Sequence, residues 1–180
     1  MFDPHAPVEI VTLRDERASD VEAIGRVIAA AFADEPRHGQ FERQIVDALR
    51  ADGALSVSLV AERDERVIGH VAFSPVSIGG EPAGGQQWYG LAPLAVLPEC
   101  QRHSIGAGLV RTGLDALRRL GARGCVVLAD PAYYTRFGFA PSGDLVFPDV
   151  PPEYFLALAF DDTAPRPSGD VRYHDVFYPA

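Results

Sequence analysis

Hydrophobic and polar residues follow two different periods along this chain, and each period predicts one kind of element. Apolar residues recur at every second position over 8–14, which predicts a strand. They recur at every third or fourth position over 19–32 and 39–53, which predicts two helices. Residues 55–78 contain two β-rich runs joined by the polar sequence RDER, which predicts an antiparallel hairpin.

A long interrupted strand and a helix dominate the second half of the pattern. The strand is predicted over 86–97, and Pro93 predicts a bulge or a parting from one neighbour, because proline donates no ladder hydrogen bond. Residues 105–120 gather their apolar side chains in one helical stripe, and Gly121 is typical of a helix C-terminus. The apolar run 125–130 follows, and this order predicts a right-handed parallel crossover.

Shorter elements complete the pattern. Residues 131–138 predict a short helix that begins at Pro131 and ends at Gly138. Further β segments are predicted in the sequences DLVF, YFLALAF and VRYHDVFY. The last of these pairs either within its own sheet or with a second subunit, so a homodimer is one of two interpretations.

Composition and charge exclude some classes of partner but do not identify a function. The 180 residues predict one domain spanning 1–180, with a formal charge of −9 from 25 acidic and 16 basic residues. This charge repels nucleic acid and anionic membrane surfaces, so neither is an expected partner. It favours a cationic small molecule, or it reflects only solvated acidic side chains. Two cysteines without a zinc-type cluster predict no metal site.

The same features predict a cytoplasmic location. The N-terminal sequence MFDPHAPVEIV lacks the basic start and long apolar run of a secretory signal. The longest helical apolar run, 27–33, is far shorter than the ~20 residues that span a bilayer. Two cysteines are also too few for a disulfide framework, which fits a reducing compartment.

The segment LPECQRHSIGAGL, residues 97–109, carries the most specific chemistry. The first N–H groups of a helix lack partners and the helix dipole adds positive potential, so this helix start suits an anion. Gly106 and Gly108 let a ligand approach the backbone, and Arg102 adds a positive charge. A tight structural turn is the other interpretation. Neither the GxGxxG fingerprint nor the GxxxxGK[ST] loop fits, because no third glycine and no lysine follow.

Gln101 to Gly106 match the pattern QxxGxG except at Ser104, which replaces the first glycine. With the flanking sequences LAPLAVLPE and GLVRTGLDALRRLGARGCVVLADPAYYTRFGF, residues 88–139 resemble the GCN5-related N-acetyltransferase (GNAT) superfamily, particularly its YhbS-like branch. The resemblance implies an α/β (α+β) fold with a mixed, mostly antiparallel central sheet, a splayed middle strand and flanking helices. If Ser104 needs a positive φ, it costs on the order of 1 kcal/mol.

The resemblance also implies an activity and its residues. It implies an N-acetyltransferase that moves an acetyl group from acetyl-CoA to a primary amine by direct transfer in a ternary complex. In the sequence YYTRFGF, Tyr134 aligns with the general acid that faces the departing sulfur, while Tyr133 is interpreted as a packing residue. The implied coenzyme contacts are Leu94, Ala95, Val96, Gln101, Arg102, His103, Ser104, Ile105, Gly106, Ala107 and Tyr134.

The acceptor side is left open by the sequence. The acceptor is expected to be a small-molecule or peptide amine. Candidates for its base are Asp34, Glu35, Glu42 and His70, or a water chain, and a hydrogen-bonded core histidine is the preferred interpretation of His70. Trp88 and Tyr89 either line the acceptor pocket or pack in the core. Two further alternatives are a non-catalytic acyl-CoA-binding regulatory module and an enzyme with a longer acyl donor or an alcohol acceptor.

Overall fold

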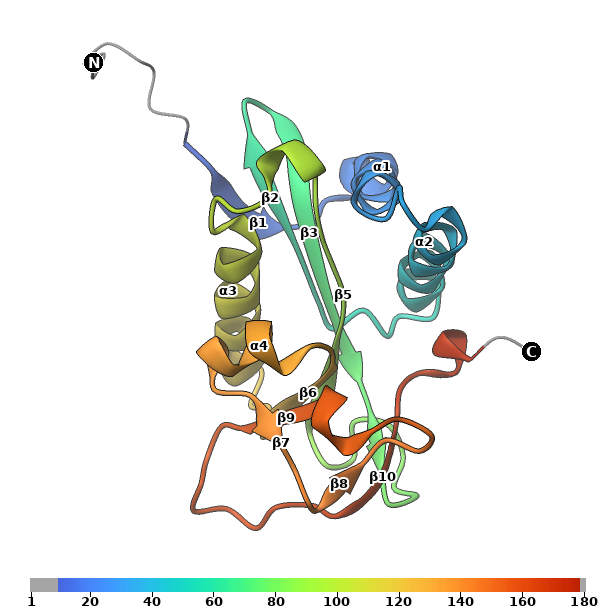
Figure 1. The fold of residues 1–180 in the computed structure, drawn as a ribbon, viewed down its shortest axis with the longest axis vertical. Coiled ribbons are helices and arrows are strands. Elements are labelled where there is room, and N and C mark those ends of the chain that lie inside the picture. Colours follow the sequence, from blue (N-terminus) through green and yellow to red (C-terminus); the bar gives the residue numbers. More distant parts are fainter. Residues whose placement is uncertain (1–9, 179–180) are drawn as a thin grey trace.

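The computed structural model describes residues 10–178 as a twisted central sheet with helices on both faces (Figure 1). The sheet has seven strands in the order β1 (Thr12–Asp15), β2 (Val57–Arg63), β3 (Arg66–Pro75), β5 (Trp88–Val96), β6 (Gly124–Leu128), β9 (Phe155–Ala159) and β7 (Ala140–Pro141). All neighbouring pairs are antiparallel except β5 and β6. The predicted mixed, mostly antiparallel sheet is confirmed.

The N-terminal elements follow the predicted order with shifted ends. The first predicted strand, 8–14, begins only at Thr12 within the described residues, and positions 8 and 9 lie outside them. The hairpin turn at Asp64 and Glu65 has φ values of 49° and 60°, the left-handed pair that a two-residue turn between twisted strands requires. The predicted hairpin between β2 and β3 is confirmed.

The helices divide between the two faces of the sheet. Figure 1 shows α1 (Val21–Ala31) and α2 (Pro36–Ala51) on one face, and α3 (Ile105–Arg119) and α4 (Pro131–Tyr134) on the other. The second helix begins three residues before the predicted start, because proline is well suited to the first turn of a helix. It ends just before Gly53, which has a φ of 67°.

The middle strand β5 parts from one neighbour, as the resemblance implies. It pairs with β3 along most of its length, with an irregularity between Val71 and Phe73. It pairs with β6 only from Trp88 to Gly90. Beyond Gly90 the two strands diverge and leave a fork, which opens toward the start of α3. The parallel crossover from β5 through α3 to β6 is confirmed.

The C-terminal segment pairs within its own chain. A second, three-stranded sheet has the order β4 (Ser77–Ile78), β10 (Gly169–Arg172) and β8 (Leu145–Val146). Strand β10 is antiparallel to β4 and parallel to β8. Of the two interpretations of VRYHDVFY, the structure shows the pairing within the chain for residues 171 and 172.

Candidate active site

A cavity of about 510 Å³ opens at the N-terminus of α3, where the sequence predicts an anion site. Its wall is formed by the end of β5, the loop before α3, the first turn of α3, the short helix α4 and the turn that follows α4. Its lining residues are Leu94, Val96, Cys100, Gln101, Arg102, Ser104, Ile105, Gly106, Ala107, Tyr133 and Arg136. Most of the coenzyme contacts that the resemblance implies are therefore brought together.

The backbone of the loop turns the first amides of α3 toward this cavity. Ser104 is the N-cap residue and has a φ of 62°, so the positive φ that would make serine costly here is present. Arg102 is also left-handed, with a φ of 64°. The first intrahelical bond of α3 joins the Gly108 N–H to the Ser104 carbonyl at 2.9 Å. The N–H groups of residues 105–107 precede that bond and have no intrahelical acceptor, and all three residues line the cavity.

The polar side chains of the loop before α3 make different contacts. The Gln101 side-chain amide donates to the Val96 carbonyl at 3.1 Å, so it ties the loop to the end of β5. Arg102 lines the cavity and places a cation beside the free amides. His103 is exposed, and its Nδ1 lies 3.4 Å from the Cys100 carbonyl oxygen. The structure therefore places His103 outside the lining.

Ala95 is also outside the cavity lining. It is buried, whereas its neighbours Leu94 and Val96 line the cavity. Successive side chains of a strand point to opposite faces of the sheet, so Ala95 faces α1 and α2, beside its cross-strand neighbour His70. A contact between Ala95 and the coenzyme is then available only through its backbone.

Tyr133 rather than Tyr134 forms the cavity wall on α4. Tyr134 is only 8% exposed and packs edge-on against Tyr133, Phe137 and Phe139. The Tyr133 hydroxyl lies 3.0 Å from the position that a Cβ at residue 106 would occupy, so it faces the helix start directly. The sequence-based interpretation of Tyr133 as a packing residue therefore did not anticipate that it lines the cavity.

Arg136 is a second lining residue that the sequence reasoning missed. Its guanidinium lies 4.5 Å from the centre of the Tyr133 ring, and both residues line the cavity. The sequence held one signal for this: Tyr133 and Arg136 are three residues apart, and residues three apart on a helical turn lie on the same side of it. Asp130, one turn before Tyr133, accepts a hydrogen bond from the Ala132 N–H at 2.8 Å and so caps the start of α4.

On the other face of the sheet, one predicted base candidate has an unusual environment. Burial raises the pKa of Glu42, and its hydrogen bond to His38 at 2.9 Å only partly opposes that rise. The second carboxylate oxygen of Glu42 is buried and has no hydrogen-bond partner among residues 10–178. Glu35, which also contacts His38, and Asp34 are exposed. Glu42 therefore combines a raised pKa with a buried, unpaired carboxylate oxygen, a combination that is common at functional sites.

His70 is a hydrogen-bonded core histidine, as predicted. It is fully buried, and its Nε2 lies 2.8 Å from the Ser58 hydroxyl. That hydroxyl donates its single hydrogen to the Glu16 carboxylate at 2.6 Å. Ser58 must therefore accept from His70, which fixes the hydrogen of the neutral imidazole on Nε2. Arg50 completes the chain with two hydrogen bonds to Glu16.

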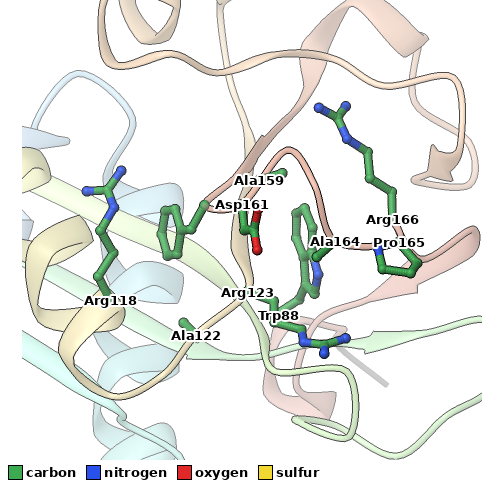
Figure 2. Close-up of a pocket in the computed structure, with 10 residues that line it drawn as sticks. Trp88, Arg118, Ala122, Arg123, Ala159, Asp161, Ala164, Pro165 and Arg166 are labelled. Carbon is green, nitrogen blue, oxygen red and sulfur yellow. The ribbon is translucent and has the colours of Figure 1, made fainter.

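A second cavity, of about 360 Å³, lies at the far end of α3 and does not share this chemistry (Figure 2). Figure 2 shows Arg118 and Arg166 at opposite ends of it. Arg118 pairs with Asp115 and Arg166 pairs with Asp162, each near 3 Å, so acidic partners oppose both cations. Trp88 lies between them but is only 3% exposed, which supports its interpretation as a core residue.

Within the described part of the chain, no three His, Cys, Asp or Glu side chains gather as a metal site. None of the helices between residues 10 and 178 combines the length and apolar character that crossing a bilayer requires.

Comparison with known proteins decides the family. The model of the acetyltransferase (GNAT) family matches residues 21–139, which is more than half of the chain. The chain belongs to the GNAT family. The Escherichia coli K12 protein YhbS, described as an uncharacterized N-acetyltransferase, is 38% identical over 170 residues, which cover 92% of this chain and 97% of YhbS.

Solved structures of GNAT proteins agree with this fold. A GNAT acetyltransferase from Brucella melitensis, in complex with acetyl-CoA, is 48% identical with a TM-score of 0.80, covering 94% of this chain and 99% of its own. Escherichia coli YhbS, in complex with CoA, is 36% identical with a TM-score of 0.87, covering 98% of this chain and 97% of its own. The resemblance seen in the sequence is confirmed for both the family and the fold.

Proposed function

We propose that this protein is an acetyl-CoA-dependent N-acetyltransferase that transfers the acetyl group directly to a primary amine. The observation that carries the proposal is the cavity at the start of α3, where unpaired amides meet the parted end of β5. Membership of the GNAT family supports it, as do the acetyl-CoA and CoA complexes of the two relatives. The formal charge of −9 favours a cationic acceptor.

The residues of the cavity fit the coenzyme. The free N–H groups of residues 105–107 would hold the diphosphate, because a helix N-terminus combines unpaired donors with positive potential. Arg102 and Arg136 add two cations to the same wall. Gly106 keeps the cradle open, since a Cβ there would lie 3.0 Å from the Tyr133 hydroxyl. Leu94 and Val96 supply an apolar face for the pantetheine arm.

The bound coenzyme supplies the acetyl group as a thioester, and the protein contributes position and protons. The amine nitrogen forms the new bond to the acetyl carbon and releases one proton to a base or to water. The carbon–sulfur bond breaks, and the sulfur leaves as a thiolate that needs stabilisation until it takes up a proton. Burial raises the pKa of Tyr134 above its ordinary value, so its hydroxyl stays protonated and remains a hydrogen-bond donor. Because a thiol is a stronger acid than this phenol, Tyr134 would stabilise the thiolate by donating a hydrogen bond rather than by full proton transfer.

A matched pair of substitutions tests the assignment of the acid. Tyr134→Phe is expected to lower the rate of thiol release roughly ten- to a thousandfold, with a change below about twofold in the Kd for acetyl-CoA. Tyr133→Phe is expected to weaken acetyl-CoA binding while turnover changes less. Calorimetry and a free-thiol assay over a panel of amines measure both. A larger loss of turnover in Tyr133→Phe would move the acid to Tyr133.

A non-catalytic acyl-CoA-binding module is the second candidate, and the burial of Tyr134 behind Tyr133 favours it. Such a module binds acetyl-CoA but releases no thiol with any amine. The same titration separates the two candidates, because the enzyme shows both binding and amine-dependent thiol release. Absence of acetyl-CoA binding in the wild-type protein would contradict both.

A further inference from the structure

Three arginines near the start of α3 have no carboxylate partner. Arg102 and Arg136 line the cavity at this end of the helix, and Arg111 lies within α3 itself. Among residues 10–178, none of the three forms an ion pair with Asp or Glu, and Asp115, one turn after Arg111, is held by Arg118 at 3.1 Å. In a chain with a formal charge of −9, unpaired cations at one cavity indicate an anionic ligand.

Aromatic rings hold two of these guanidinium groups in place beside α4. The Arg136 guanidinium lies 4.5 Å from the centre of the Tyr133 ring, and the Arg111 guanidinium lies 5.2 Å from the centre of the Phe137 ring. The two rings meet edge-on, with their centres 5.5 Å apart. A guanidinium over a ring keeps its N–H donors free for an acceptor. Arg111 and Arg136 are therefore positioned donors that no carboxylate of the described residues accepts from.

Tyr133 connects these two arginines to the free amides at the start of α3. Its hydroxyl lies 3.0 Å from the position that a Cβ at residue 106 would occupy. Burial raises the pKa of Tyr133, and the charges of Arg136 and Arg111 partly oppose that rise. Both guanidinium groups therefore lie within electrostatic range of the hydroxyl. The positive potential of the helix start continues across Tyr133 toward the arginines.

The proposed coenzyme carries phosphate at two places, a diphosphate in its middle and a 3′-phosphate on the ribose of its adenosine. The free amides of residues 105–107 suit the diphosphate, and Arg102 belongs to the loop that precedes them. The 3′-phosphate is a monoester with a charge of about −1.5 to −2 at pH 7. Guanidinium groups match it, because their forked N–H donors reach two phosphate oxygens at once.

We propose that Arg136 and Arg111 bind the 3′-phosphate of the coenzyme and so make the protein selective for CoA over 3′-dephospho-CoA. This inference rests on the coenzyme site proposed above. The diphosphate occupies the helix amides and Arg102, which leaves the two arginines beside α4 for the second anion. The 3′-phosphate is at the end of the coenzyme remote from the thioester, so its contacts contribute affinity and selectivity but take no part in acetyl transfer.

Calorimetry on the full-length protein tests the proposal, with CoA and 3′-dephospho-CoA as the two ligands. The wild-type protein is expected to bind CoA about ten- to a hundredfold more tightly, the value of one or two charge-assisted hydrogen bonds. Arg136→Gln and Arg111→Gln are each expected to weaken CoA binding about threefold or more, with the dephospho-CoA Kd unchanged within about twofold. Arg119→Gln, at an exposed arginine in the last turn of α3, is the matched control and leaves both Kd values unchanged.

The outcomes separate this inference from the proposed function. Equal affinity of the wild-type protein for CoA and dephospho-CoA overturns the inference and leaves the proposed function standing. A preference for CoA that both Arg136→Gln and Arg111→Gln retain also overturns it, because the 3′-phosphate is then bound elsewhere. Wild-type protein that binds neither ligand contradicts the proposed function as well.

A second measurement uses only the nucleotide end of the coenzyme. Adenosine 3′,5′-bisphosphate carries the 3′-phosphate, whereas adenosine 5′-monophosphate lacks it. At equal concentration the bisphosphate is expected to raise the Tm of the wild-type protein more than the monophosphate does, and the Arg136→Gln, Arg111→Gln double variant should lose that difference. Both arginines are exposed, so the double variant is expected to melt as the wild-type protein does without ligand. Equal Tm shifts from the two nucleotides in the wild-type protein overturn the proposal.

Discussion

At the scale of single residues, the loop before α3 keeps a left-handed backbone without the glycine that usually permits it. Ser104 has φ and ψ values of 62° and 11°, and Arg102 is also left-handed. A Cβ in this region crowds the following carbonyl, which costs about 1 kcal/mol or more per residue. The helix N-cap therefore carries local strain at the point where the anion is expected to bind.

Replacing Ser104 with glycine is expected to relieve that strain. Ser104→Gly should raise the free energy of unfolding by about 0.5–1 kcal/mol, because glycine reaches this backbone without a Cβ clash but loses more freedom on folding. That change corresponds to roughly 1–4 °C in Tm for a chain of this size. Thermal melts of the ligand-free protein measure it. Ser104→Ala, which keeps the Cβ, is the control, and equal Tm values for the two variants would contradict the strain.

Acetyl-CoA affinity of the same two variants separates the hydroxyl from the backbone. If the Ser104 hydroxyl hydrogen-bonds the phosphate, Ser104→Ala is expected to weaken acetyl-CoA binding by about three- to tenfold, the value of one such bond. Ser104→Gly loses the same bond and should weaken it similarly. Calorimetric Kd values that match the wild-type value in both variants would show that only the backbone amides hold the anion.

At the scale of elements, the helices and strands that the sequence predicted are those whose pattern lies within a few adjacent residues. The apolar stripe and Gly121 predicted α3, and Pro93 predicted the irregularity that the pairing of β3 with β5 shows opposite it, because each depends on a few neighbouring residues. The small sheet of β4, β8 and β10 joins segments far apart in the chain, so no local pattern specified its pairing. For the same reason the cavity wall at Tyr133 and the apposition of Tyr173 and Gly90 became visible only in the structure.

The packing of α3 on the sheet depends on one glycine. A Cβ at residue 113 would lie 2.2 Å from the ring of Phe73, a fully buried residue of β3 that has little room to move. Gly113→Ala is therefore expected to lower the free energy of unfolding by about 1–3 kcal/mol, despite the better helix propensity of alanine. Urea denaturation measures the change.

A second glycine of the same helix is the matched control. At residue 108 a Cβ would meet only the end of the Leu13 side chain, at 3.2 Å. Because that methyl group can shift, Gly108→Ala is expected to be neutral or to stabilise the protein by up to about 1 kcal/mol. Equal destabilisation by the two substitutions would show that loss of glycine itself, rather than contact with Phe73, sets the cost.

At the scale of the whole molecule, a largely buried polar chain joins four segments of the sequence. It runs from Arg50 on α2 through Glu16 after β1 and Ser58 on β2 to His70 on β3. Burial raises the pKa of Glu16, but hydrogen bonds from Arg50 and Ser58 outweigh it and lower that pKa overall. The chain thus holds an ionised carboxylate and a neutral imidazole together on the face of the sheet that α1 and α2 cover.

The imidazole makes stability depend on pH. Burial lowers the pKa of His70 from its ordinary 6.5 to about 4 in the folded protein. Between these values the unfolded chain binds a proton that the folded protein does not, so stability is complete above pH 6.5 and falls as pH drops toward 4. From pH 7.5 to 5 the wild-type protein is expected to lose about 2 kcal/mol of its free energy of unfolding through this group.

Two substitutions test this pH dependence in urea melts. His70→Gln, which retains a donor for Ser58, should remove most of the dependence of stability on pH. His103→Gln, at the exposed loop histidine, should keep it. A slope that survives in His70→Gln would place the pH dependence elsewhere, because Glu16, with its lowered pKa, loses its contribution only in more acidic solution.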